Sequence, residues 1–145
     1  MTNFNFHNIE LTVDKALTKA TYDKAINKGV SGCKCVNCLN FATNIDNVFP
    51  AEVLSLFLKL GIDYKKYVEV WHSVSSNKNQ HIYEGWFNFK GNFIENEKND
   101  VIQITENFKM WFSHNIMFSF FDNEEDLVQI WFVVNTDWLI DNDCV

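Results

Sequence analysis

Three cysteines that lie close together are the residues of this chain best suited to chemistry. Cys33, Cys35 and Cys38 fall within six residues, and Cys144 lies near the end of the sequence. Zinc takes four nitrogen, sulfur or oxygen ligands in a near-tetrahedral arrangement. The spacing therefore predicts a metal site formed by Cys33, Cys35, Cys38 and Cys144. The other candidates for the fourth ligand are His72, His81 and His114.

Two other interpretations of the same cysteines stay open. Zinc sites usually pair two short ligand hairpins and this sequence has one, so the thiols are also interpreted as small buried packing groups. Cys35 and Cys38 form a C-x-x-C pair, which at a helix N-terminus favours a thiolate and is typical of thiol-dependent redox enzymes. Cys33 would then resolve the disulfide, although no strand–helix–strand unit of the thioredoxin kind is evident around it.

Two histidines flank a polar turn and are expected to face each other across a hairpin. His72 and His81 lie on either side of residues 75–79, and with Glu69, Glu84 and Tyr83 they would form an acid/base pocket. Paired histidines on neighbouring strands are more often surface residues. The sequence contains no G-x-S-x-G, H-E-x-x-H, P-loop or G-x-G-x-x-G motif, which favours a non-enzymatic protein.

Large aromatic side chains crowd the second half of the chain. Adjacent pairs such as Trp86-Phe87 point to opposite faces if they lie on strands, so some rings are left on a face that helices do not cover. Exposed aromatic surface usually marks a partner or ligand site, although loops or a second copy of the chain would equally cover it. Acidic segments at 122–126 and 141–143 would rim this surface. The predicted binding residues are Trp71, His72, His81, Tyr83, Trp86 and Trp131.

The first half of the chain, about residues 12–66, is predicted to be mostly helical. Thr12 or Asp14 caps the first helix, and Gly29 ends it. Pro50 fits the first position of the last helix, which Gly61 ends. The predicted elements are a strand at 4–11, a helix after residue 14, a short helix at 35–44 and a helix from residue 50.

The second half, about residues 67–140, is predicted to be rich in strands. The expected strands are 67–74, 81–89, 101–105, 108–112, 116–121 and 127–134. Strands joined by short turns pair antiparallel, and the earlier helices then cover one face of the sheet. The expected fold class is α+β: a single domain over residues 1–145, with N-terminal helices packed on one face of a mostly antiparallel sheet.

The charge balance argues against nucleic-acid binding. The chain of 145 residues has a net charge of −7, and all 12 of its basic residues are lysine. Arginine supplies the planar fork that clamps phosphates and reads guanine, whereas lysine acts only as a point charge. We therefore expect no nucleic-acid partner, and an acidic surface that favours a basic protein partner.

No targeting or membrane segment is evident. No apolar run approaches the ~20 residues that a membrane-spanning helix needs. The first residues lack the basic and apolar regions of a signal peptide. We expect a cytoplasmic protein without membrane contact, in which thiols stay reduced.

Four short motifs resemble those of an uncharacterised family of small bacterial proteins. The motifs are G-C-x-C-x-x-C-x-N-F at 32–41, F-P-x-E at 49–52, L-G-I-D at 60–63 and Y-x-G-W-F at 83–87. Together they span about a third of the chain. The family has no assigned activity, so the resemblance supports the domain boundaries and implies no function.

The sequence therefore favours a non-enzymatic binding protein. Small size, acidity, excess aromatic residues and missing catalytic motifs suggest a protein inhibitor, for example of the immunity or anti-defence type. The alternatives are a small-molecule or zinc-binding protein using the Cys33, Cys35 and Cys38 cluster, and a thiol-dependent redox enzyme. No cofactor other than zinc is expected, and a homo-oligomer is left open.

Overall fold

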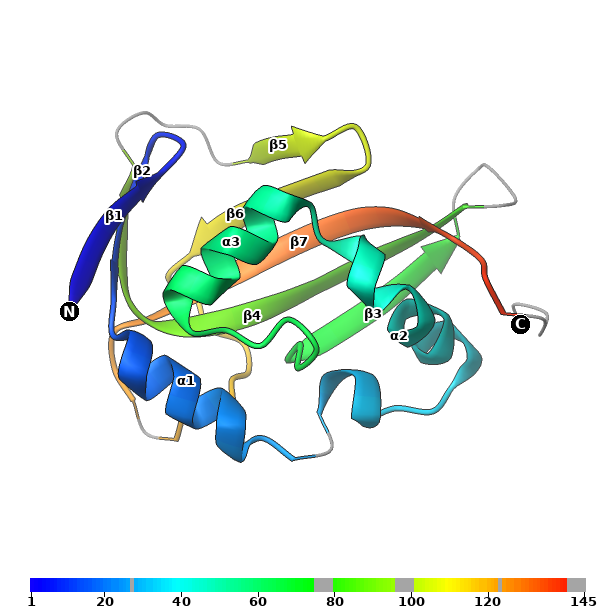
Figure 1. Cartoon of the computed structure of the whole chain (residues 1–145), viewed down its shortest axis with the longest axis horizontal. Coiled ribbons are helices and arrows are strands. Elements are labelled where there is room, and N and C mark those ends of the chain that lie inside the picture. The colour runs from blue at the N-terminus through cyan, green and yellow to red at the C-terminus, as the bar shows by residue number, and fades with distance from the viewer. Residues whose placement is uncertain (27, 75–79, 96–100, 123, 141–145) are drawn as a thin grey trace.

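The fold is a curved antiparallel sheet with helices packed on one face, as a computed structural model shows (Figure 1). The structure describes residues 1–26, 28–74, 80–95, 101–122 and 124–140. Within them lie three α-helices, one 3₁₀ turn and seven strands. This confirms the predicted α+β class. None of these helices is long and apolar enough to cross a membrane.

One long strand, β4 (Gln80–Glu95), organises the sheet. Along one edge it pairs with β7 (Leu127–Asp137). Its other edge pairs with β3 (Glu69–Val74) over the first half and with β2 (Ile9–Val13) over the second. The order β1-β2-β4-β7-β6-β5 is completed by β1 (Thr2–Phe6), β6 (Phe108–Ser113) and β5 (Ile102–Thr105). All pairings are antiparallel, so the predicted sheet is confirmed, and β4 continues six residues beyond its predicted end.

The helix boundaries follow local capping. Asp14 caps α1 (Lys15–Lys24) by accepting from the Leu17 amide at 3.0 Å, as predicted. Helix α2 (Val36–Val48) is longer than expected, and α3 (Ala51–Leu60) starts one residue after Pro50. Gly61 ends α3 with φ of 84°, a left-handed conformation that glycine adopts at little cost.

Three sequence expectations on element boundaries were wrong. The strand expected at 4–11 is a hairpin, because His7 takes a left-handed φ of 54° and turns the chain. Helix α1 ends at Lys24 rather than at Gly29, because the backbone adopts an extended conformation at Ala25. Gly29 instead begins the 3₁₀ turn η1 (Gly29–Ser31).

The third wrong expectation was a strand at 116–121. Residues 114–122, here called the crossing segment, form no ladder with a strand. The segment bonds instead to side chains of the sheet face that the helices leave free: the Met117 amide donates to Gln129 Oε1 at 3.0 Å, and Trp86 Nε1 donates to the Phe118 carbonyl at 2.9 Å. Backbone groups satisfied by side chains do not need a partner strand.

Aromatic rings fill the space between the helices and the sheet. Phe41 of α2 is fully buried and stacks on Phe132 of β7 with ring centroids 6.1 Å apart. Phe49, directly after α2, meets both Phe132 and Phe87. Trp86 and Trp131 point to the opposite face, as predicted from the Trp–Phe pairs. Residues before position 67 thus share one core with the strands.

Candidate functional site

The cysteine cluster forms a compact group of sulfur atoms just before and within the first turn of α2. The Sγ atoms of Cys33, Cys35 and Cys38 all lie within 4.8 Å of one another. All three are free thiols; Cys33 and Cys35 are exposed and Cys38 is half-buried. The three residues are therefore positioned to hold a metal ion such as zinc.

Local backbone geometry positions the sulfurs. Cys35 is the N-cap of α2, and its Sγ accepts the Cys38 amide at 3.4 Å. The Sγ of Cys33 accepts the Cys35 amide at 3.5 Å. Hydrogen bonds from backbone amides to sulfur favour the thiolate, the form that binds metal.

The fold also anchors this loop from outside. The Tyr83 hydroxyl, on β4, donates to the carbonyl of Asn37, which lies between Cys35 and Cys38, at 2.8 Å. On the other side, the amide of Val30 in η1 donates to the carbonyl of Lys65 at 3.0 Å. The sulfurs are thus carried by a loop that is tied to the domain at both ends.

The two cysteines of the C-x-x-C pair differ in electrostatics. The Cys38 amide lowers the pKa of the exposed Cys35 thiol. Burial raises the pKa of the Cys38 thiol, and its sulfur neighbours raise it further. Burial, and then charge on the nearby cysteines, raises the pKa of the Tyr67 hydroxyl. These effects indicate that Tyr67 lies close to the cluster.

The dimensions of the cluster fit a thiolate-bound metal. With zinc–sulfur bonds of ~2.3 Å and tetrahedral angles, sulfurs around one zinc ion lie about 3.8 Å apart. The observed separations, all within 4.8 Å, need to contract by about 1 Å at most. Cys144, the predicted fourth ligand, lies outside the described residues. No histidine among those residues joins the three sulfurs in the cluster.

The two histidines meet across the β3–β4 hairpin, as predicted. His72 Nε2 and His81 Nδ1 are 2.6 Å apart, so one ring donates a hydrogen and the other accepts it. Trp138 packs on His81 with ring centroids 4.6 Å apart, and burial lowers the pKa of His72. Glu84 is the register partner of Trp71, so its side chain lies on the sheet face away from the two histidines. The carboxylate therefore does not face the histidines as the acid/base hypothesis requires.

The tryptophans form a row across the helix-free face. Trp86, Trp131 and Trp111 are direct register partners on β4, β7 and β6. Trp71 on β3 extends the row, with its ring 5.5 Å from that of Trp86. The crossing segment covers Trp86, which is 3% exposed, whereas Trp71 is 45% exposed. We call these four residues the tryptophan row.

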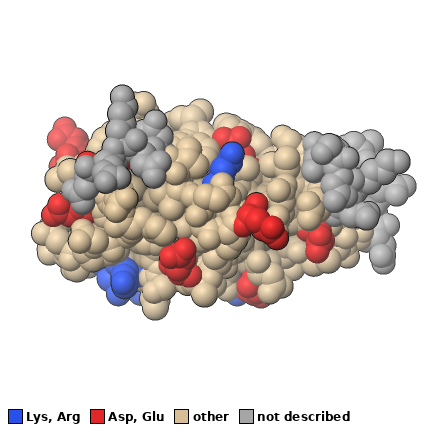
Figure 2. Space-filling model, turned by 90° about the horizontal axis from the view of Figure 1, so that it is seen from above, with Lys and Arg blue, Asp and Glu red and all other residues tan. Residues whose placement is uncertain are grey.

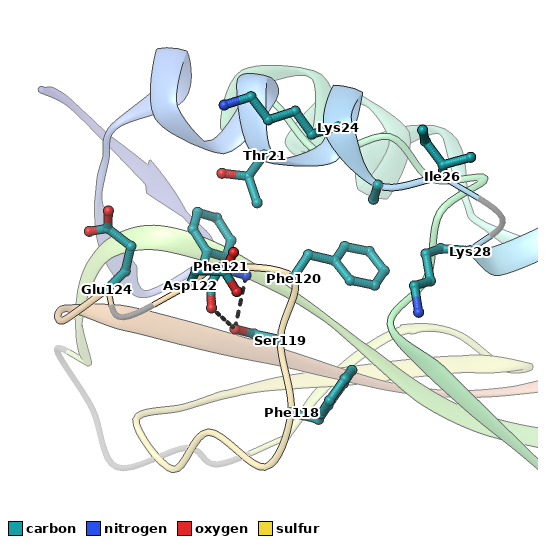
Figure 3. Close-up of a pocket in the computed structure, with 11 residues that line it drawn as sticks. Thr21, Lys24, Ile26, Lys28, Phe118, Ser119, Phe120, Phe121, Asp122 and Glu124 are labelled. Carbon is teal, nitrogen blue, oxygen red and sulfur yellow. Dashed lines mark hydrogen bonds between the residues drawn. The ribbon is translucent and has the colours of Figure 1, made fainter.

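A cavity of about 440 Å³ lies between the end of α1 and the crossing segment (Figure 3). Phe118 and Phe120 line it with apolar surface. Lys24 at the end of α1 and Lys28, just before η1, also line it, and no carboxylate of the described residues pairs with either. None of the described cysteines or histidines contributes to it, so the cavity is separate from both groups.

The predicted binding residues divide between the two faces. His72, His81 and Tyr83 lie on the helix side, whereas Trp71, Trp86 and Trp131 lie on the other. These six residues therefore do not form one surface.

Sequence reasoning missed two residues that shape these sites. Trp111 completes the tryptophan row, and strand register was the signal needed to find it. Asn40, within the cysteine motif, is fully buried and holds the C-terminal segment. The available signal for Asn40 was a polar residue at a position of the predicted helix that faces the core.

No family model, curated protein or solved structure matches this chain. The function is therefore inferred from the fold and its sites, and the resemblance to a bacterial family stays a prediction.

Proposed function

We propose that the protein binds zinc through the thiolates of Cys33, Cys35 and Cys38. The observation that supports this is the convergence of three sulfurs within 4.8 Å, two of which accept backbone amides. A cysteine that only packs the core needs neither convergence nor exposure, yet Cys33 and Cys35 are exposed. Thiolate ligands select soft or borderline ions, of which zinc is the common one in proteins.

The proposal leaves two candidates for the fourth ligand. One is Cys144, the residue that the sequence predicts. Water would otherwise complete the tetrahedron, as in zinc sites with three protein ligands. Cobalt substitution distinguishes a Cys144 ligand from a water ligand, because the intensity of the thiolate-to-cobalt charge-transfer band grows with the number of bound thiolates.

The test is metal content and thiol reactivity of the purified full chain. We expect about one zinc ion per chain and blocked thiols, as a four-coordinate site requires. Cys38→Ser should lose the metal, whereas Ser31→Ala, a neighbouring exposed control, should retain it. Freely reactive thiols in a zinc-free protein that also fails to take up added zinc would refute the proposal.

The redox alternative uses the same residues and is distinguished by a different assay. The exposed Cys35 at a helix N-terminus resembles an attacking thiol, with Cys38 as its C-x-x-C partner and Cys33 as the thiol predicted to resolve the disulfide. Turnover of a disulfide reporter by metal-free protein, abolished by Cys35→Ser, would favour this alternative over zinc binding.

A second candidate function is docking of a basic protein partner on the tryptophan row. The observation that favours it is Trp71, exposed in a row of four rings with Glu84 as its register partner. An aromatic face beside carboxylates suits lysine or arginine side chains. Figure 2 shows acidic side chains scattered over a largely uncharged surface, in keeping with the net charge of −7.

An inhibitor of the immunity or anti-defence type would act through such a surface. Its test is capture of a defined basic partner and measurement of affinity with variants. Trp71→Ala should weaken binding strongly, because exposed aromatic anchors dominate interface energies. Leu58→Ala, an exposed apolar control on α3, should leave it unchanged. Equal affinity of both variants would refute this use of the row.

A further inference from the structure

The cysteine site is open to solvent on the side of two of its sulfurs. Cys33 and Cys35 are exposed, and Cys38 is half-buried. A structural zinc site normally encloses its metal with four ligands from separate segments. Here the described ligands come from one stretch of six residues, so an incoming ligand can reach the metal position from solvent.

The fold around the site does not depend on a metal for its core. Phe41, one turn after the cysteines, is fully buried among aromatic rings of the sheet. Tyr83 and Asn40 tie the start of α2 to the sheet and to the C-terminal segment by hydrogen bonds. These contacts hold the helix without help from the thiols.

A metal held by such a local motif adds little to folding stability. Ligand binding stabilises a fold only to the extent that the unfolded chain binds the ligand less well. Three cysteines within six residues remain close together when the chain unfolds, so the unfolded chain retains much of the affinity. The loop that the metal closes is short, and closing a short loop removes little chain entropy.

We infer that this site is an exchange site, which passes its metal ion to a thiol-bearing acceptor; this rests on the zinc binding proposed above. An acceptor thiol loses its proton and its sulfur bonds to the zinc. The bond between the zinc and the Cys33 sulfur breaks, and Cys33 takes up a proton. Cys33 leaves first because it is exposed and lies outside α2, whereas Cys35 is the N-cap of α2 and Cys38 lies within its first turn. No electron is transferred, and repetition at Cys35 and Cys38 completes the transfer.

The test follows zinc transfer from the zinc-loaded full chain to a metal-free peptide with two C-x-x-C hairpins. We expect a transfer rate that rises in proportion to peptide concentration, and no transfer to the matched peptide with serine in place of cysteine. Removal of zinc should lower the midpoint of thermal unfolding by less than about 5 °C.

Two results with the wild-type chain alone would overturn the exchange site while leaving zinc binding intact. One is a rate that does not depend on peptide concentration, because release of the metal would then precede attack. The other is unfolding of the chain on zinc removal. The variant Cys144→Ser provides a further comparison with wild type. An unchanged transfer rate supports an open site. Slow transfer from wild type that becomes faster in the variant shows that the site is closed. A chain that takes up no zinc at all refutes the proposed function itself.

Discussion

Replacement of Asn40 by alanine should destabilise the domain through the C-terminal segment. Asn40 is fully buried in α2, next to the cysteine loop. Its Nδ2 donates to the Tyr83 hydroxyl at 3.2 Å and to the Asp137 carbonyl at 3.1 Å. Its Oδ1 accepts the Leu139 amide at 2.8 Å. One side chain thus joins α2, β4 and the chain beyond β7.

The expected loss is about 2–3 kcal/mol. Each of the three hydrogen bonds contributes about 1 kcal/mol net. Tyr83 and Asp137 keep other partners in the Asn37 carbonyl and the Asn44 side chain, whereas the Leu139 amide loses its described partner. The better helix propensity of alanine offsets about 0.5 kcal/mol.

Asn44→Ala is the matched control. Asn44 is also a buried asparagine of α2, but both carbonyls to which it donates, those of Asn40 and Asp137, have other donors. We expect its loss to be about 1 kcal/mol or less. Urea unfolding at constant m-value gives both numbers. Hydrogen exchange at the Leu139 amide should speed up in Asn40→Ala. Equal destabilisation by the two variants, or unchanged exchange, would show that the network does not hold the segment.

Three further outcomes follow from close contacts elsewhere in the sheet. Gly85→Ala should cost about 3 kcal/mol or prevent folding, because the added Cβ would lie 2.2 Å from the Glu69 carbonyl oxygen; urea midpoints measure this. The pKa of His72 is lowered in the folded protein, so stability should be complete above the unfolded value of about 6.5 and fall as the pH drops below it, by at most about 1.4 kcal/mol per pH unit for one proton. His72→Gln should flatten that pH dependence, and an unchanged slope would contradict the assignment. Trp86→Phe removes the donor to the Phe118 carbonyl and should cost about 1–2 kcal/mol, with faster proteolysis within the crossing segment than in wild type.

Much of the local structure could be predicted from the sequence. Asp14 and Gly61 mark helix ends because capping and left-handed turns depend on residues within one helical turn. The alternation of Trp86 and Phe87 assigns their faces because side chains on a strand alternate. Three expectations were wrong: the strand at 4–11 is a hairpin, and α1 ends at Lys24 rather than at Gly29. The third is the segment 116–121, which is rich in apolar and aromatic residues but lies across the sheet and forms no strand.

The sequence by itself indicated the cysteine cluster, because three thiols fall within six residues and a helix start supplies amides that can bond to them. Only the tertiary structure decided which distant residues meet elsewhere in the fold. The row that joins Trp71 to Trp111 depends on strand order, and the hydrogen bond from the Leu139 amide to Asn40 depends on helix docking. Those arrangements are set by burial of apolar surface over the whole chain, which no short stretch of residues specifies.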